Sequence, residues 1–432
     1  MKRIPASAIE RSLRVIGFGI QSGITAVTRT RTVLQQAEAL AKVLGQMKGS
    51  MMKAGQLLGL AGEHFFPPEI NAVLRTLNAK SEPVDWPVME RTLRRRLGPA
   101  KLALLEIEPT PLAAASLGQV HLATIKNSGE RICLKIQYPG VAKAIEGDLR
   151  NLRMVLRMAG VLPVEIDERI IFSEVRDMLR REVDYGQELL ATREYRRLAG
   201  DDPRYLVPDV FEEFSGSKIL ATRWIESLDV EDPKVSRLSV DRRNQLAENF
   251  LELFFNEYFS WNFVQTDPHF GNYRIRPGKD GSPDQLVLLD FGAVRKFPAD
   301  FVRKYAGMVK AALDSDPAAI ASAGKRLGIL PLDAPPVMEQ VFVELCLAVV
   351  EPFAGGKYDW RANELPRRTT ALGLKLVVEQ KLPSPPRELL FLDRKLGGVF
   401  VFLSHLGARI DGRPLLEGMI ERCLADANKN QS

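Results

Sequence analysis

The stretch Gln265-Thr266-Asp267-Pro268-His269-Phe270-Gly271-Asn272 places an aspartate and an asparagine five positions apart, in a segment rich in turn-forming residues. Further along the chain, the apolar run Leu286–Leu289 ends in Asp290-Phe291-Gly292. An aspartate at the end of a buried strand can hold a divalent cation, and the glycine after it lets the chain turn away sharply. Taken alone, the first stretch could be an ordinary turn. Its position ahead of Asp290 instead favours a site in which these side chains act together.

The spacing suggests a role for each polar side chain. Asp267 and Asn272 have the separation found between the catalytic aspartate and the metal-binding asparagine of protein kinases, and Asp-Phe-Gly follows in the kinase order. Asn272 and Asp290 would hold magnesium on the phosphates, and Asp267 would orient the nucleophile or accept its proton. The sequence therefore predicts a phosphoryl-transfer site that uses ATP or ADP with Mg2+.

A lysine, Lys135, interrupts the apolar strand predicted directly after a hairpin turn. A buried ammonium group needs anionic partners, and the kinase-type lysine pairs with phosphate and with a glutamate on the next helix. The helix predicted around Arg180–Arg193 offers three partners: Glu182, Asp184 and Glu188. Asp184 and Glu188 share a helix face, whereas Glu182 and Glu188 do not. The alternatives are an edge-strand lysine facing water and an acidic helix facing solvent.

The loop before this strand is rich in alanine where kinases carry several glycines. It reads Ala113-Ala114-Ala115-Ser116-Leu117-Gly118-Gln119-Val120 and keeps one glycine. Alanine allows close backbone approach but disfavours the positive φ angles that glycine permits. We expect a stiffer loop that binds phosphates in a different pose. The simpler interpretation is a small-residue turn leading into a strand.

Apolar periodicity predicts helices in the first hundred residues, a small sheet in the middle and a mainly helical remainder. One long helix or a bent pair is expected over Thr32–Leu60, and a helical region interrupted by Glu82-Pro83 over Glu69–Leu97, with a break at Gly98-Pro99. Further helices are expected over Val141–Ala159 and Asp167–Leu198. Strands are expected over Val120–Ile125, Arg131–Gln137, Val207–Phe211, Lys218–Thr222, Asn272–Ile275 and Gln285–Leu289. The expected fold is α+β, a two-lobed atypical kinase-like fold. Its parts are an N-terminal helical extension (1–100), a sheet-bearing N-lobe (101–225) and a helical C-lobe (226–432).

The composition is that of a globular protein, with 45% apolar and 26% charged residues. A formal charge of +6 is a mild excess, so nucleic acid is not an expected partner. The densest basic run, Arg91–Arg96, lies on a helix-like stretch. It is interpreted as a solvated helix face, with contact to anionic lipid or an acidic partner as the alternative.

The three cysteines lie far apart and the four histidines lack metal-ligand spacing, so neither a disulfide framework nor a zinc site is predicted. Charged residues such as Glu10 and Arg14 precede any apolar run, and no apolar run of about 18 residues occurs. Neither a secretion signal nor a transmembrane helix is therefore expected. A cytoplasmic location is expected, and the basic N-terminus would allow peripheral contact with the inner membrane.

Five ordered motifs resemble the UbiB family, also called AarF-domain kinases, which includes mitochondrial members of coenzyme Q biosynthesis. The motifs are Lys53-Ala54-Gly55-Gln56, the alanine-rich Ala113–Gln119, Glu182-Val183-Asp184 with Glu188, Asp267–Asn272 and Asp290–Gly292. The resemblance covers roughly Lys48 to Arg409, and Phe391–Arg409 is similar to the tail of the mitochondrial members.

The resemblance implies roles for particular residues. Catalytic roles are implied for Asp267, Lys135, Glu188 and Lys53, and metal binding for Asn272 and Asp290. Nucleotide contacts are implied for Ala113, Ala114, Ala115, Ser116, Gly118, Gln119, Lys135, Arg223 and Ile225. A gating motif is implied for Lys53, Gly55, Gln56, Glu182 and Asp184. In this family the helix with the Lys-x-Gly-Gln motif folds over the cleft, which would disfavour protein substrates.

The function implied by the resemblance is that of an ATP-binding atypical kinase or ATPase supporting ubiquinone or other isoprenoid-lipid metabolism. Isoprenoid lipids and quinone-pathway enzymes are the implied partners. The alternatives are a pseudokinase scaffold that binds nucleotide and lipid without turnover, and a protein kinase acting in trans. The retained Lys135, Asp267, Asn272 and Asp290 argue against the scaffold. The alanine-rich loop and the Lys53 motif argue against the protein kinase.

The sequence departs from the family pattern at several positions. Gln265-Thr266 replaces the usual His-Ala before the catalytic aspartate, and Phe270 stands where proline is common. Glu188-Leu189-Leu190-Ala191 lacks the usual asparagine, and no Ala-Pro-Glu segment follows Asp290. The last departure removes the part of a protein kinase that docks peptides. The C-terminal membrane spans of some bacterial members are also absent from this sequence.

Overall fold

The computed structural model describes residues 50–61, 70, 73–74, 83–115, 117–161, 168–279, 281–362, 364–383 and 385–429. These residues form two compact units. Unit 1 contains the described residues up to Arg193 together with Asp209–Trp224, and unit 2 contains Glu194–Pro208 and the described residues from Ile225 onward. This grouping places the helix of the Lys53 motif in the same unit as the sheet, whereas the sequence had assigned it to a separate extension.

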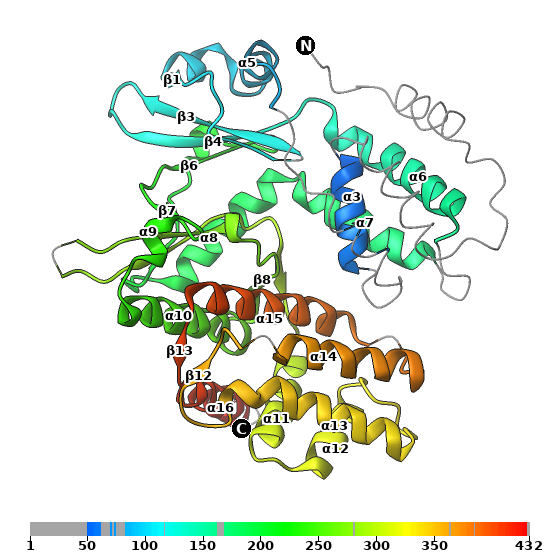
Figure 1. The fold of residues 1–432 in the computed structure, drawn as a ribbon. Helices are drawn as coiled ribbons and strands as arrows, with labels where there is room; N and C mark the ends of the chain where they lie inside the picture. The colour runs from blue at the N-terminus through cyan, green and yellow to red at the C-terminus, as the bar shows by residue number, and fades with distance from the viewer. Residues whose placement is uncertain are drawn as a thin grey trace. The chain divides into compact units, whose positions relative to one another are not determined.

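Unit 1 is built around a five-stranded antiparallel sheet with the order β1-β3-β4-β6, in which β2 pairs with β3 (Figure 1). The strands are β1 (Leu105–Ile107), β2 (Ala113–Ala114), β3 (Gly118–Ile125), β4 (Arg131–Gln137) and β6 (Ile219–Arg223). The predicted hairpin between β3 and β4 is confirmed, and Gly129 in its turn adopts a φ of 72°. Such a positive φ favours glycine, which explains the residue at this point of the turn.

Helices cover the sheet and form the rest of unit 1. They are α3 (Ser50–Ala61), α5 (Trp86–Ala103), α6 (Val141–Ala159), α7 (Glu168–Glu182), α8 (Tyr185–Ala199, whose last residues belong to unit 2) and the short η1 (Glu212–Phe214). The apolar face of the sheet, with Ile132, Leu134 and Ile136, shares one buried core with Met89 and Leu93 of α5. The dark-blue helix α3 of Figure 1 packs against α6 and α7.

One helix prediction needs correction, and another is confirmed. The single helix expected over Asp167–Leu198 is two helices, α7 and α8, separated at Val183-Asp184. Aspartate is among the best residues for beginning a helix, because its side chain can accept from the first free backbone N–H groups. The break expected at Gly98-Pro99 is confirmed: Gly98 has a non-helical φ of 79°, and a further helical turn follows the kink. The part of the predicted Thr32–Leu60 helix before Ser50 lies outside the described residues.

Unit 2 contains three small sheets. The largest has the order β5-β10-β9-β7, and β5 runs parallel to β10. The strands are β5 (Tyr205–Leu206), β7 (Leu228–Asp229), β8 (Phe263–Gln265), β9 (Tyr273–Arg276), β10 (Gln285–Leu288), β11 (Val294–Lys296), β12 (Tyr358–Asp359) and β13 (Arg409–Ile410). The strand expected over Val207–Phe211 is wrong: β5 ends at Leu206, and Val210 makes only an isolated bridge to Thr222. Pro208, which has no N–H to donate, prevents a continuous strand.

The remainder of unit 2 is helical. Its helices are α9 (Pro233–Ser236), α10 (Val240–Phe255), α11 (Ala299–Leu313), α12 (Pro317–Arg326), α13 (Pro336–Val350), α14 (Glu364–Leu374), α15 (Arg387–Leu406) and α16 (Arg413–Lys429). Short turns are η2 (Asn256–Ser260), η3 (Phe270–Asn272), η4 (Glu351–Phe353) and η5 (Lys375–Glu379). Helices α10 and α15 pack together, and the rings of Phe250 and Phe402 stack at 3.8 Å between centroids. Among the described residues, every helix is too short or too polar to cross a lipid bilayer.

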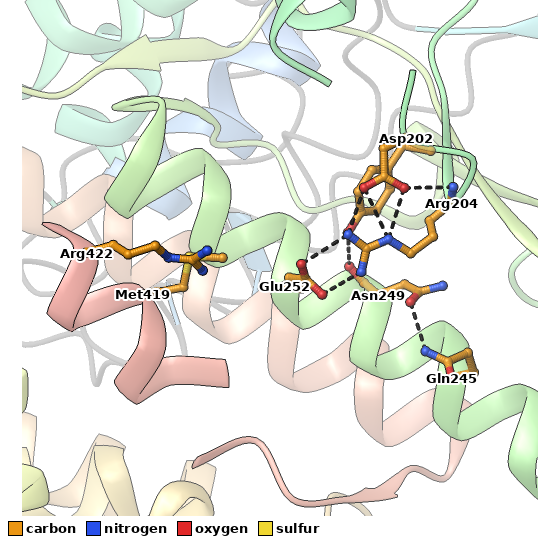
Figure 2. Close-up of polar contacts among 8 residues, drawn as sticks. Asp202, Arg204, Gln245, Asn249, Glu252, Met419 and Arg422 are labelled. Carbon is orange, nitrogen blue, oxygen red and sulfur yellow. Dashed lines mark hydrogen bonds and ion pairs between the residues drawn. The ribbon is translucent and has the colours of Figure 1, made fainter. Parts of the chain in front are cut away.

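Arg204 connects the segment before β5 to α10. Its guanidinium donates to Asp202 at 2.7 Å and to Glu252 of α10 at 3.0 Å, as Figure 2 shows. These hydrogen bonds, with that of Asp202 first, raise the pKa of Arg204 above its ordinary value, and Arg204 in turn lowers the pKa of Asp202. One charged side chain therefore joins two parts of unit 2 that are distant in sequence.

Replacing Arg204 by methionine should lower the free energy of unfolding by about 1–2 kcal/mol, because both carboxylates lose a charged hydrogen bond while partly exposed to water. Since the pKa of Asp202 is lowered in the folded state, this contribution is present at neutral pH and declines as the pH falls below about 4. Urea denaturation measures both effects. Arg422→Met, which removes a contact with Met419, is the control and should change stability by less than about 0.5 kcal/mol. Equal losses for the two variants would contradict the assignment.

Candidate functional site

The strand lysine of unit 1 pairs with a buried glutamate. The Lys135 ammonium in β4 donates to both carboxylate oxygens of Glu188, at 2.7 and 2.9 Å. The side chain of Glu188 is 3% exposed and that of Lys135 is 24% exposed, so the carboxylate is the buried partner. The ring of Tyr185 lies beside the ammonium, with its centroid 5.1 Å away. The geometry therefore selects Glu188 from the three candidates that the sequence left open.

The other two acidic candidates have separate partners. Asp184 does not lie on a helix with Glu188; it precedes α8, and its Oδ1 accepts from the backbone N–H groups of Gly186 at 3.1 Å and Gln187 at 3.3 Å. The expectation that Asp184 and Glu188 share a helix face is therefore wrong, because Asp184 begins the helix instead of extending it. Glu182, the last residue of α7, forms an ion pair with Lys53 of α3 at 2.8 Å.

The side chain of Lys53 lies beside that of Glu182, and the family motif had implied that these two residues act together. Its side chain is 14% exposed, and its neighbours Ala54, Leu57 and Leu58 are buried in the core of unit 1. An ammonium this close to an apolar core is stabilised only by an anion. Gly55 is buried in the same helix, and the side chain of Gln56 lies outside the described residues.

The alanine-rich loop forms a tight turn next to the lysine strand. Ala113 and Ala114 pair with β3, and the N–H of Ala115 donates to the carbonyl of Gly118 at 2.8 Å. A Cβ atom at Gly118 would lie 2.5 Å from the carbonyl oxygen of Ile136, so only glycine fits. Ser116 lies outside the described residues.

The implied role of Gln119 in nucleotide contact needs correction. Strand register pairs Val120 with Lys135, so Val120 shares the face of Lys135 and Gln119 points to the opposite face. There the buried Gln119 amide accepts from the N–H of Val84 at 2.9 Å and lies 2.8 Å from Nε2 of His121. The sequence missed Val120, although the alternation of the strand could have identified it.

Arg223 also points away from the face of Lys135. Leu220 pairs with Lys135 in the register of β6, which places Arg223 on the opposite face. The guanidinium of Arg223 donates to Asp209 at 2.9 Å and forms an ion pair with Glu130. Its side chain therefore stabilises unit 1 and does not line the candidate nucleotide face. Ile225 belongs to unit 2, as the first residue of its second segment, and its carbonyl accepts from the Ser227 hydroxyl at 3.0 Å.

In unit 2 the structure brings together the predicted catalytic residue, Asp267, and the two predicted metal ligands, Asn272 and Asp290. The Nδ2 of Asn272 donates to the carbonyl of Asp267 at 2.9 Å and lies 3.3 Å from its Oδ2. The N–H of Leu289 donates to the carbonyl of Asn272 at 2.8 Å, which places the following residue, Asp290, beside the same loop. Asp290 has a φ of 50°, a conformation that aspartate tolerates, and its Oδ1 accepts from the N–H of Gly292 at 3.1 Å.

Helix α15 contributes a residue that sequence analysis did not assign to the site. The Arg394 guanidinium donates to Oδ1 of Asp267 at 2.7 Å. Close packing supports this contact, because a Cβ atom at Gly398 would lie 1.9 Å from Cβ of Pro268. The resemblance of Phe391–Arg409 to a family tail indicated this segment but no function for it. Its position beside the loop depends on tertiary folding.

Gln265 links the loop to the Asp-Phe-Gly segment. Its Nε2 donates to the carbonyl of Asp290 at 3.2 Å, and its Oε1 accepts from the N–H of Asp267 at 3.1 Å and from the hydroxyl of Tyr273 at 3.1 Å. The backbone N–H of Gln265 donates to Glu257 at 3.2 Å. The glutamine that replaces the family's usual histidine therefore forms hydrogen bonds to both Asp267 and Asp290 and fixes the distance between them. The sequence did not reveal this role.

A buried ion pair supports this glutamine. The Lys395 ammonium, 1% exposed, lies 2.7 Å from Oε2 of Glu257 and donates to the Tyr273 hydroxyl at 3.2 Å. Glu257 lies in the π-helical turn η2, and its Oε1 also accepts from the hydroxyl of Tyr195 at 2.7 Å. Burial acts to lower the pKa of Lys395, but Glu257 and Tyr273 outweigh it and the net shift is upward. Lys395 is therefore charged and part of the framework.

The comparisons with known proteins agree with this geometry. The model of the ABC1 atypical kinase-like domain matches residues 76–323, more than half of the chain. The chain therefore belongs to the ABC1 atypical kinase-like family, which confirms the resemblance to the UbiB, or AarF-domain, kinases.

Individual relatives extend the match beyond this domain. The chain is 30% identical to the rat mitochondrial atypical kinase COQ8B, over 98% of this chain and 82% of that protein. It is also 30% identical to the mitochondrial atypical kinase COQ8 of Saccharomyces cerevisiae, over 84% of this chain and 72% of that protein. A solved structure of Rv3197 from Mycobacterium tuberculosis with erythromycin has a TM-score of 0.64 at 23% identity and covers 96% of this chain and 98% of that one. The predicted α+β, atypical kinase-like fold is thus confirmed.

Lys395→Met should lower the free energy of unfolding by roughly 3–5 kcal/mol, because it leaves the buried Glu257 carboxylate without its cation. The double variant Lys395→Met/Glu257→Gln should recover most of that loss, since no uncompensated charge remains. Urea denaturation followed by circular dichroism measures both. Lys310→Met, at an exposed surface pair with Asp314, is the matched control and should leave the midpoint unchanged. A double variant as unstable as Lys395→Met would show that the pairing of charges is not what stabilises this site.

Proposed function

We propose that the chain binds Mg-ATP and hydrolyses it, or transfers its γ-phosphoryl group to a small or lipid acceptor, in support of ubiquinone or related isoprenoid-lipid metabolism. The observation that carries the proposal is the bidentate pair of Lys135 with the buried Glu188. An ammonium fixed on a strand in this way is what a kinase uses to hold the α- and β-phosphates. Family membership and the COQ8 relatives support the same assignment.

In unit 1 the proposed nucleotide face is the face of β3 and β4 that bears Val120 and Lys135. Lys135 would neutralise phosphate charge, and the tight turn at Ala113–Ala115 would approach the phosphates through its backbone. The ion pair of Lys53 with Glu182 would act as the gate implied by the family motif. Loss of this ion pair would leave the Glu182 carboxylate without its Lys53 partner.

In unit 2 the residues present fit a magnesium ion. The donors are the side-chain oxygens of Asn272 and Asp290, and Mg2+ prefers carboxylate and amide oxygens. Bound magnesium would neutralise charge on the phosphates. Asp267 is held by Arg394 through Oδ1 and lies beside Asn272 through Oδ2. A carboxylate engaged on both oxygens is suited to orienting a water or hydroxyl nucleophile more than to removing its proton.

The partners are proposed from the same relatives. An isoprenoid lipid or a quinone-pathway enzyme would supply the acceptor or respond to hydrolysis, with peripheral contact at a membrane surface. The pseudokinase scaffold is less well supported, because the polar residues of phosphoryl transfer are retained and held by specific contacts.

Purified protein should release phosphate from ATP in the presence of magnesium, and Asp290→Asn should reduce the rate at least about a hundredfold, because it removes a charged ligand from the proposed metal site. A coupled phosphate-release assay measures this. Asp314→Asn, at an exposed position of unit 2, is the matched control and should keep the wild-type rate. Equal phosphate release by wild type and Asp290→Asn would contradict the proposal.

Deletion of the gene in its native cell should lower the ubiquinone level and accumulate an isoprenoid precursor, because the proposed activity supports that pathway. Mass-spectrometric profiling of quinones and lipids measures the change. Complementation with wild type should restore the profile and Asp290→Asn should not. An unchanged quinone pool with a normal ATPase would refute the pathway assignment while leaving the enzymatic activity in place.

A further inference from the structure

The corner between α7 and α8 is attached to the lysine strand through Gln137, a residue that none of the five motifs includes. Nε2 of Gln137 in β4 donates to the backbone carbonyl of Val183 at 2.7 Å. Both residues are buried, Gln137 at 3% and Val183 at 7% exposure. Val183 follows the last residue of α7, where helix carbonyls lack intrahelical partners. Gln137 therefore satisfies a buried carbonyl at the end of a helix.

This contact and the catalytic pair together hold α8 to β4 at two points. Gln137 and Lys135 are two positions apart on one strand and so share a face. Lys135 holds Glu188 in the first turn of α8, and Gln137 holds Val183 just ahead of that turn. Two contacts, one on each side of the helix start, fix the direction of α8 relative to the strand.

The same corner contacts the ion pair of Lys53 with Glu182, proposed as the gate, and the alanine-rich loop before β3. Glu182, directly before Val183, pairs with Lys53 of α3. Tyr185, the first residue of α8, packs against the loop so closely that a Cβ atom at Gly118 would lie 2.6 Å from its hydroxyl oxygen. Movement of Glu182 would therefore displace the neighbouring Val183 carbonyl and the ring that contacts Gly118.

We infer that Gln137 is a positioning residue that couples the ion pair of Lys53 with Glu182 to the catalytic pair of Lys135 with Glu188. This inference rests on the proposed nucleotide function of unit 1. Gln137 does not touch the phosphates; it transmits the state of α3 through the Val183 carbonyl to the first turn of α8. Coupling between two sites of this kind is measured by the non-additivity of their substitutions.

The test is a double-mutant cycle on the full-length chain, with Mg-ATP affinity measured by isothermal titration calorimetry. Lys53→Met should weaken binding by about fivefold in the wild-type background, since loss of the ion pair releases Glu182 and, through the neighbouring Val183 carbonyl, shifts the first turn of α8 that holds Glu188 to Lys135. Gln137→Met keeps the length of the side chain and removes its donor. In the Gln137→Met background, Lys53→Met should change the dissociation constant by less than about twofold.

Gln187→Met is the matched control, because this glutamine lies at the same corner with an exposed side chain. In that background the effect of Lys53→Met should stay at about fivefold. If Gln137→Met does not fold, Gln137→Asn, which keeps the amide but shortens its reach, replaces it with the same expectation. Equal effects of Lys53→Met in all backgrounds would overturn the coupling and leave nucleotide binding established. Absence of Mg-ATP binding by wild type would overturn both the coupling and the proposed function.

Discussion

A lysine inside an apolar strand is stable only if an anion lies beside it, and this requirement organises unit 1. Glu188 supplies the anion from a more buried position than the lysine, so the helix that carries it must lie against β4. That helix cannot extend backwards, because Asp184 satisfies its first N–H groups and forces a corner after α7. The corner in turn places Glu182 within reach of Lys53. One ion pair thus sets the geometry of the lysine, the helix start and the gate.

In unit 2 the polar residues of the candidate site are also held in place by specific contacts, but these are hydrogen bonds to a glutamine. The loop that bears Asp267 is held by hydrogen bonds that converge on Gln265. Glu257, which accepts from the backbone N–H of Gln265, forms a fully buried ion pair with Lys395. Each member of this pair also has a hydrogen bond with a tyrosine. Breaking such a pair costs far more than forming it contributes, so the network favours one arrangement of the loop over alternatives.

The departures from the family pattern have physical consequences at these positions. Glutamine in place of the family's histidine, two positions before Asp267, keeps a donor toward the carbonyl of Asp290 but introduces no group that titrates near neutral pH. The alanine-rich loop follows the family pattern instead and differs from the glycine-rich loop of protein kinases. Its alanines permit a short strand pairing with β3, in which glycines would be more mobile. Both features favour a preorganised site over an adaptable one. This suits a protein whose proposed substrates are small.

The sequence by itself determined the chemistry: Lys135, Asp267, Asn272 and Asp290 were identified by spacing, and the β3–β4 hairpin and α6 by periodicity and turn residues. These features are local, so residue order is sufficient to specify them. Tertiary structure decided which acidic residue pairs with Lys135, because the helix break at Asp184 changes the direction in which the Glu188 side chain points. It also decided the faces of Gln119 and Arg223, which depend on strand register. Arg394 and Lys395 act more than a hundred residues from the loop that they hold. Contacts at that separation arise only when α15 packs on α10, and no local pattern encodes them.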